Sequence, residues 1–356
     1  MLFEFARAPR ICIVICGVLL FGSAAAHHSR SNYEMQEFLE YDGTVVEFAW
    51  RNPHAFVVIE VLDESNQPWR LLLEMNSKPI LSGMGWKADS VTVGDRIHVR
   101  GNPDKRAERK QLFVAYIINR DGEKLWSFGR PQSERERQEA ANPVIRKPVV
   151  GSTDFTGVWA RARLSDEDRA RNAQFGPAQL PLTAAGQAAL DKYDPEDDPG
   201  FECLPNTLPQ TIVPVYPMQF ERVDDELLTI RYEYNNGYRE IHIGQTDFPS
   251  DLEPTRMGYS IGKIEDDALI IQTRHFTFDR WGNGRGVPSG ENKDVTERYT
   301  LTDNGERMEV SFTVTDADYL EGPQEERRGA YVIRSNVELS DFNCDPDAAV
   351  RHLTGE

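Results

Sequence analysis

The sequence has few cysteines, few basic residues and only short apolar runs. Its 356 residues include four cysteines, and 40 lysines and arginines stand against 58 aspartates and glutamates, a formal net charge of −18. Nucleic-acid binding depends on lysine and arginine contacts to phosphate, so this charge argues against nucleic acid as a partner and disfavours anionic membrane surfaces. The apolar run at residues 11–21 is too short to span a bilayer, and no later run is longer. We therefore expect no stable membrane insertion.

The first 26 residues have the features of an export signal. Two arginines precede the apolar run, and small residues follow it, with Ala24 and Ala26 in the positions that signal peptidase reads. This pattern predicts cleavage near Ala26 and a periplasmic or secreted protein. Cys203 and Cys344 remain after cleavage. In an oxidising compartment their simplest expected state is one disulfide, and the alternative is two free buried thiols.

Short alternating apolar stretches separated by turn signals occupy residues 38–126. They predict three strands, a short helical or turn element at residues 77–86, and two further strands. This is the element order of an OB-like five-stranded barrel, so residues 27–126 are expected to form such a domain. Residues 127–152 are polar, charged and proline-bearing, which indicates a linker.

Residues 153–356 are expected to form a second β domain. One helix is predicted at residues 182–193 with Thr183 as its N-cap, and at least seven strand-like stretches follow it. Strands do not alternate with long helices, which excludes a parallel α/β architecture. The predicted fold is all-β: the OB-like barrel, and then a larger antiparallel β-barrel or sandwich.

Several motifs resemble those of two families of exported bacterial proteins. The stretches HHS, YDGTVVEFAWRNPH and GWKADSVTVGDRIHVRGNP resemble an exported domain family of unknown function. The stretches FTGVW, YDPEDDPGFECLPN and GYSIGKIEDDALIIQT resemble a family of uncharacterised secreted proteins. These resemblances imply a fold and a compartment but no activity. The triplet that ends at Trp159 is similar to the first strand of lipocalin-like barrels, so a lipocalin-like second domain is expected, with Trp159 as a candidate ligand contact.

Two adjacent histidines, His27 and His28, follow the predicted cleavage site. After cleavage at Ala26, the α-amine and imidazole of His27 can chelate one Cu(II), and His28 or His54 can add a further nitrogen. After cleavage at Ala25, a histidine at position three can bind Cu(II) or Ni(II) together with backbone amides. The alternative is a disordered terminus. His54, in the turn NPHAF, is the best internal candidate ligand, and its alternative is a hydrogen-bonded histidine at the rim.

Arginines in the second domain suggest a ligand pocket. If Arg231, Arg239 or Arg298 point into a barrel, they mark a site for an anionic, partly apolar ligand. The alternative is a set of ion pairs on the outer face. The glycine-rich stretch WGNGRGVPSG is expected to be a loop at one end of the barrel, with Trp281 and Arg285 as contacts.

An enzyme would need a histidine or carboxylate with a shifted pKa inside a cavity, and the candidates are His242, His275 and Glu297. The stretch GYSIG matches the pattern of a serine nucleophile, but the residues after it predict a strand rather than the required helix. We therefore assign it a structural role.

The leading hypothesis is an exported, non-catalytic binding protein for a small-molecule ligand, with copper bound by the N-terminal histidines. The second hypothesis is a periplasmic hydrolase or isomerase that acts in the second barrel. The third is a module that binds another periplasmic protein, which predicts an exposed apolar patch.

Overall fold

The computed structural model confirms the predicted all-β class. It describes residues 32–129, 153–162, 165–167, 170, 180–212, 216–284, 286–323, 327–334, 338–347 and 350. The predicted signal, His27, His28, Arg285 and most of the predicted linker lie outside these residues, so the predicted domain boundaries stay predictions.

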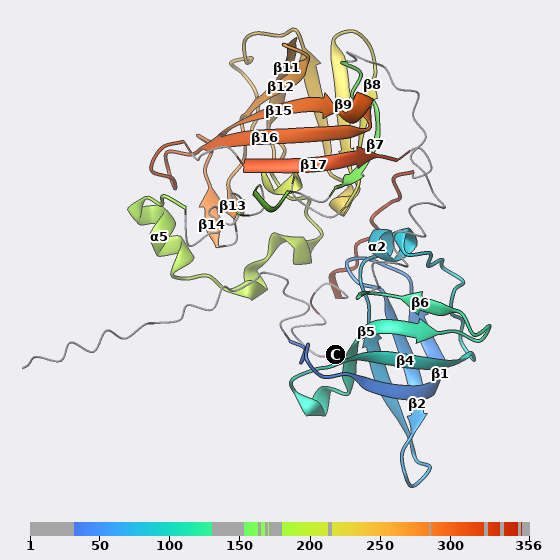
Figure 1. The fold of residues 1–356 in the computed structure, drawn as a ribbon. Coiled ribbons are helices and arrows are strands. Elements are labelled where there is room, and N and C mark those ends of the chain that lie inside the picture. The colour runs from blue at the N-terminus through green and yellow to red at the C-terminus, as the bar shows by residue number, and fades with distance from the viewer. Residues whose placement is uncertain are drawn as a thin grey trace, which may run out of the picture.

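The first barrel is a five-stranded sheet that closes on itself. Its strands are β1 (Leu39–Ala49), β2 (Phe56–Leu62), β3 (Pro68–Glu74), β4 (Arg96–Pro103) and β5 (Gln111–Ile118). They pair in the order β3-β2-β1-β4-β5, and a parallel pairing of β3 with β5 closes the barrel. The short helix α2 (Lys78–Gly83) follows β3 in the chain and lies at one end of this barrel in Figure 1. This topology is that of the predicted OB-like barrel.

The stretch from residue 110 to residue 126 was expected to be one strand, but it forms a hairpin of β5 and β6 (Lys124–Trp126). The side chain of Asn119 accepts hydrogen bonds from the backbone N–H groups of Asp121 and Glu123, at 3.0 and 2.9 Å. This local bonding and the glycine at position 122, which has φ of 78°, make the turn. The Asp-Gly dipeptide is the sequence signal of that turn.

The second barrel contains nine strands. They are β7 (Gly157–Arg161), β8 (Met218–Arg222), β9 (Leu227–Tyr232), β10 (Tyr238–Ile243), β11 (Tyr259–Glu265), β12 (Ala268–Arg274), β15 (Asp294–Thr302), β16 (Arg307–Thr315) and β17 (Arg327–Ile333). They form a closed barrel in which the chain runs mainly up and down. Every neighbouring pair is antiparallel except β10 and β11, which are parallel. This confirms the predicted larger barrel and its lipocalin-like character.

Side chains on alternate positions of these strands fill the interior of the second barrel. On β16, for example, Met308, Val310, Phe312 and Val314 are all at most 3% exposed, and the residues between them are partly or fully exposed. The same period of two sets which polar residues of the neighbouring strands point inward. The alternation on β9, β10 and β15 therefore decides which candidate residues lie in the interior.

Two further segments of the second half confirm or correct the sequence predictions. Helix α5 (Ala184–Leu190) begins after Thr183, whose hydroxyl accepts a hydrogen bond from the N–H of Gly186 at 3.1 Å, so the predicted N-cap is confirmed. The glycine-rich stretch was expected to be a loop, but it forms the buried hairpin of β13 (Asp279–Gly284) and β14 (Val287–Ser289). The side chain of Asn283 fixes this hairpin, because its Nδ2 donates to Asp316 at 2.8 Å.

Cys203 and Cys344 form the predicted disulfide, across 141 residues of sequence. The segment around Cys344 also contacts the first barrel (Figure 1): Asn52 Nδ2 donates to the carbonyl of Phe342 at 2.8 Å, and Arg51 pairs with Asp345. The segment around Cys344 is therefore linked by the disulfide to Cys203 and is also bound by the first barrel. Among the described residues there is no helix long and apolar enough to cross a membrane.

Candidate functional site

A buried carboxylate with a half-buried histidine beside it lies at one end of the first barrel. Glu74 is the last residue of β3 and its side chain is 1% exposed. Its Oε2 accepts hydrogen bonds from Tyr33 Oη at 2.5 Å and from Gln111 Nε2 at 3.0 Å, and its Oε1 contacts His54 Nδ1. The carboxylate therefore has partners on both oxygens, and none of these partners carries a permanent positive charge.

The histidine of this cluster has one ring nitrogen toward the protein interior and one available for another partner. The side chain of His54 is 24% exposed. Its Nδ1 contacts Glu74 Oε1 without the geometry of a completed hydrogen bond, and Nε2 makes no hydrogen bond or ion pair within the described part of the chain. A carboxylate on one ring nitrogen fixes the orientation of an imidazole and raises the basicity of the other nitrogen, which is the arrangement found behind metal-ligating histidines. We call Tyr33, His54, Glu74 and Gln111 the Glu74 cluster.

The start of the described chain runs directly into the Glu74 cluster. Tyr33 pairs as an isolated bridge with Asp104, Asn32 accepts a hydrogen bond from the N–H of Lys105 at 2.9 Å, and Glu34 donates to Pro103 at 2.8 Å. Burial and the charge of Glu74 raise the pKa of Tyr33 far above its ordinary value, so the hydroxyl stays protonated and donates. Tyr33 is thus fixed at the carboxylate that contacts His54.

A second buried carboxylate, Glu297, lies inside the second barrel. It is 0% exposed, and Arg239 binds it with two hydrogen bonds, Nη1 to Oε2 at 2.7 Å and Nη2 to Oε1 at 3.1 Å. Tyr299 also donates to Oε1, at 2.6 Å. Burial alone favours the neutral form of Arg239, but the charge of Glu297 outweighs it and raises the pKa of the guanidinium. The interior therefore holds an ion pair with no net charge.

Other polar side chains surround this pair, and we call the whole set the Arg239 cluster. The hydroxyls of Ser260 and Thr273 lie 2.8 Å apart, and Thr273 lies 3.4 Å from Arg239 Nη1. Tyr232 lies with its ring 5.7 Å from the guanidinium carbon of Arg239. The cluster comprises Thr211, Tyr232, Arg239, Ser260, Thr273, Glu297 and Tyr299. Ser260 is thus an interior strand residue of β11, which is followed by β12, as expected from the sequence.

The structure brings together only some of the other residues predicted for the second domain. Arg231 is exposed on β9, and Arg298 is half-buried on β15 next to the inward-facing Glu297. Trp159 is 0% exposed in the barrel core and its Nε1 donates to the carbonyl of Phe155 at 2.8 Å. Trp159, Arg239 and Glu297 therefore belong to the interior, whereas Arg231 and Arg298 do not.

The two histidines proposed for an enzyme site do not reach Glu297. His242 alternates with the buried Ile241 and so faces outward, where it stacks on Tyr259 at 4.5 Å between ring centroids. His275 lies at the same surface, 5.8 Å from the ring of Phe248, which in turn lies 6.3 Å from Tyr259. These histidines form part of an aromatic surface on the outside of the barrel, whereas Glu297 lies inside it.

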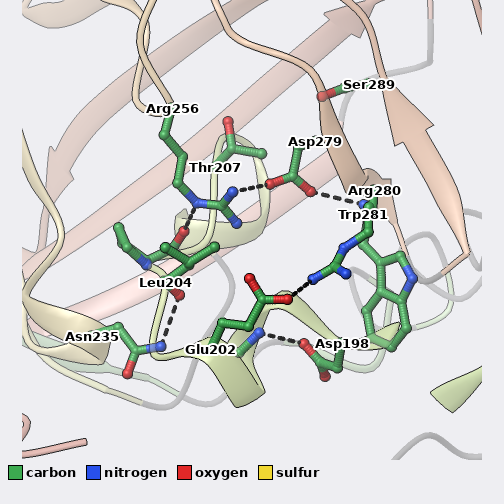
Figure 2. Close-up of polar contacts among 12 residues, drawn as sticks. Asp198, Glu202, Leu204, Thr207, Asn235, Arg256, Asp279, Arg280, Trp281 and Ser289 are labelled. Atoms are coloured by element: carbon green, nitrogen blue, oxygen red, sulfur yellow. Dashed lines mark hydrogen bonds and ion pairs between the residues drawn. The ribbon is translucent and has the colours of Figure 1, made fainter. Parts of the chain in front are cut away.

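A third polar network lies around Arg256 and Asp279, next to the buried hairpin (Figure 2). Asp279 pairs with Arg256 at 2.6 Å and accepts a hydrogen bond from the N–H of Trp281 at 2.8 Å. The Trp281 ring lies 5.4 Å from that of Tyr193. This network anchors the hairpin, so Trp281 has a structural partner, and its predicted contact with a ligand stays a prediction.

The same network holds the segment from residue 204 to residue 212 against the barrel. Figure 2 shows Asn235 donating to the carbonyl of Leu204, at 2.8 Å. Arg256 donates to the carbonyl of Pro205. Lys293, which is 1% exposed, donates to Leu208, Ser289 and Thr207 at 2.8, 3.0 and 3.3 Å. Burial lowers the pKa of Lys293 to about 7, against the opposing charges of Asp279 and Asp316. Lys293 was not predicted from the sequence, because this residue lies in a polar stretch that resembles a surface loop.

Three members of the Glu74 cluster were also not predicted from the sequence: Glu74, Tyr33 and Gln111. Each lies at the end or start of a different segment, and the parallel pairing of β3 with β5 brings two of them together. A carboxylate at the end of the apolar run LLLE was the available signal. No group of three or more histidine, cysteine, aspartate or glutamate side chains suited to a metal ion occurs among the residues that the structure describes. Any metal at His54 would therefore need ligands from elsewhere.

Comparison with known proteins gives a family of unknown function. The model of "Family of unknown function (DUF6152)" matches residues 17–113, which include His54 and Glu74. No curated protein matches this chain. One solved structure that the chain matches is the Ifi202 HINa domain in complex with double-stranded DNA, at 11% identity and a TM-score of 0.12, covering 74% of this chain and 100% of that chain. At that TM-score the likeness carries no argument about fold or function.

Proposed function

We propose that this is an exported copper-binding protein in which His54 and the histidines at the mature N-terminus hold one Cu(II). The observation that carries the proposal is the Glu74 cluster. A buried carboxylate orients an imidazole whose outer nitrogen has no partner in the described part of the chain. Metal-ligating histidines commonly have such a carboxylate behind them.

The path of the chain supplies the further ligands. His28 lies four residues before Asn32, which is bonded to Lys105. Four residues reach at most about 14 Å, because an extended chain advances about 3.3–3.6 Å per residue. Since Tyr33 and His54 contact the two oxygens of one carboxylate, that length is enough for His27 and His28 to reach the vicinity of His54.

The donor set favours copper over other divalent metals. Cleavage after Ala26 would give an α-amine and up to three imidazoles, and Cu(II) prefers nitrogen donors in tetragonal arrangements. Copper also binds such sites more tightly than the other first-row divalent ions. The disulfide between Cys203 and Cys344 supports the exported location, because disulfides persist in oxidising compartments.

The test is a titration of Cu(II) into protein exported to a periplasm and purified without a histidine tag or chelator, followed by calorimetry against a competing chelator. We expect one copper per chain and at least a tenfold loss of affinity in His54→Ala. His27→Ala should also weaken binding, because it removes the imidazole that chelates copper together with the α-amine.

His242→Ala is the matched control, because it removes an outward-facing imidazole of the second barrel and should leave copper affinity unchanged. Copper binding that is absent, or that resists both His54→Ala and His27→Ala, would overturn the proposal. Loss in His27→Ala alone would remove His54 from the site and contradict the proposal in this form.

A further inference from the structure

The turn that carries His54 is supported on both of its sides. On the C-terminal side, the N–H of Ala55 donates to the carbonyl of Asn76 at 3.2 Å, and the N–H of Met75 donates to the carbonyl of Ala55 at 2.9 Å. Both partners directly follow β3 of the first barrel. On the N-terminal side lies Asn52, which is 0% exposed although asparagine is mostly found at the surface. A buried amide needs hydrogen-bond partners, and the partners of Asn52 therefore support the turn as well.

One partner of Asn52 comes from the distant C-terminal part of the chain. Its Oδ1 accepts a hydrogen bond from the N–H of Lys78 at 3.0 Å, whereas its Nδ2 donates to the carbonyl of Phe342 at 2.8 Å. These last two residues are 290 positions apart in the sequence. The backbone of Asn52 also pairs with Cys344 as an isolated parallel bridge. The N-terminal side of the turn is thus bound by residues 342–344.

The disulfide fixes the position of this C-terminal segment. Cys344, which pairs with Asn52, is itself bonded to Cys203. The second barrel also binds the segment through the N–H of Phe342, which donates to Asn236 Oδ1 at 3.0 Å. A covalent link confines the residue that carries it more than a single hydrogen bond does, because it limits the freedom of the chain even when weak contacts open. The support of the His54 turn therefore depends on the disulfide.

We propose that Asn52 is a positioning residue for His54 and that the disulfide between Cys203 and Cys344 sets copper affinity through it. This rests on the copper site proposed above. Both cysteines are partly exposed, so a dithiol reductant can reach them. The dithiol gives two electrons and two protons, the S–S bond breaks, the two cysteines become thiols, and the reductant becomes a disulfide. Cys344 then loses its fixed place against Asn52, the imidazole of His54 is less well oriented, and copper affinity falls.

The first experiment needs no copper. Hydrogen exchange of the full processed protein, freed of metal with a chelator, is measured by mass spectrometry with and without dithiothreitol. Residues 51–56 should exchange at least about twofold faster after reduction, the lower effect of one lost hydrogen bond, because opening of the turn is no longer restrained. Strand β4 should keep its rate, which shows that the first barrel stays folded. Equal exchange of residues 51–56 in both states would overturn the inference, whatever the copper titrations give.

The second experiment is the copper titration against a competing chelator, carried out on variants. The double change Cys203→Ser and Cys344→Ser removes the disulfide without leaving thiols that bind copper. It should weaken copper binding by about 2–10-fold, the effect of one hydrogen bond. Asn52→Ala should weaken binding at least as much, because it removes two hydrogen bonds. All three changes together should lower the affinity by less than the product of the two separate losses, because both act on one support.

Asn119→Ala is the matched control. Asn119 is a buried asparagine of the first barrel as well, but it closes the turn after β5, at the opposite end of that strand from Gln111. It should change neither copper affinity nor the exchange of residues 51–56. Copper affinity that is unchanged without the disulfide, or losses that multiply in full, would overturn this inference alone. Absence of copper binding in the unmutated protein would overturn the proposed function together with it.

Discussion

Glu74 of the first barrel and Glu297 of the second are both buried carboxylates, and their partners differ in charge. In the second barrel, Glu297 is bound on both oxygens by Arg239, whose side chain is 1% exposed. In the first barrel, Glu74 is bound by a phenol, an amide and an imidazole, and the imidazole of His54 is 24% exposed. One carboxylate is enclosed with its own counter-charge. The other directs a side chain that can bind a partner from solution.

The difference separates two roles that look alike in the sequence. A buried charge with its partner beside it is a closed unit whose removal is felt in stability. A buried carboxylate behind a half-buried histidine instead fixes the direction of a ligand, and its loss should be felt in binding. We therefore expect mutations at Glu297 to lower stability and mutations at Glu74 to lower copper affinity.

The largest effect is expected from breaking the closed pair. Arg239→Met should lower the free energy of unfolding by about 3–5 kcal/mol, because it leaves Glu297 buried without its counter-charge. Replacing both residues by methionine should recover most of that loss. Urea unfolding of the single and double variants checks this, and a single-variant loss below about 1 kcal/mol would contradict the assigned pairing.

Lys293 is a buried amine whose hydrogen-bond partners are all neutral groups, so its charge in the folded protein depends on pH. Its pKa is lowered from 10.5 to about 7, so between about pH 7 and about pH 10.5 the unfolded chain holds a proton that the folded protein lacks. Stability from this residue is therefore present above that window and is lost as pH falls through it, with a slope of up to about 1.4 kcal/mol per pH unit. Unfolding of the protein and of Lys293→Met at pH values across the window should show this slope in the unmutated protein only. Equal slopes would mean that Lys293 keeps its charge in the fold.

The open carboxylate should matter to copper more than to folding. Glu74→Gln keeps the shape of the side chain and removes its charge, so copper affinity should fall by about 10–100-fold, the usual effect of a lost carboxylate behind a histidine. Glu297→Gln is the matched control in the other barrel and should leave copper affinity unchanged. Competition titrations measure the copper affinity of both variants. An equal loss of affinity in the two would contradict the different roles assigned to Glu74 and Glu297.

The smallest effect comes from two tyrosines inside the second barrel. Tyr299 donates to Glu297, so Tyr299→Phe should cost about 1–3 kcal/mol of stability, because it leaves a buried acceptor short of a partner. Tyr232→Phe should cost less than Tyr299→Phe, since its hydroxyl bonds to Thr211 and to an Arg239 whose Nη atoms are already paired with Glu297. Thermal unfolding of the two variants side by side tests the difference, and equal losses would place Tyr232 in the closed network.

The all-β architecture and several inward residues were predictable from period and spacing. Alternation on β10 and β15 places Arg239 with Ile241, and Glu297 with Tyr299, on the same faces, as the structure has them. A period of two cannot tell the inner face of a barrel from the outer one, so Arg231, Arg239 and Arg298 remained equal candidates until the strand pairing was known.

The Glu74 cluster was only partly predictable, because it depends on pairing between distant segments. His54 stood out by its residue type and by the preceding Asn52-Pro53 turn, but nothing local identified its partner at position 74. That partner is set by the antiparallel pairing of β2 with β3, which joins Phe56 to Glu74. Gln111 follows from the parallel pairing of β3 with β5. Such contacts between separate strands are absent from any single stretch of sequence.

Electron paramagnetic resonance of the processed protein, loaded with one equivalent of isotopically pure Cu(II), tests whether His54 binds the metal. Coupling of the copper to nitrogen reports how many nitrogen donors bind it. The Glu74 cluster predicts a nitrogen-rich tetragonal spectrum that changes in His54→Ala, with the loss of one imidazole, and remains the same in His242→Ala. A spectrum identical in the unmutated protein and His54→Ala would contradict the claim, because it would mean that the first barrel supplies no ligand to the metal.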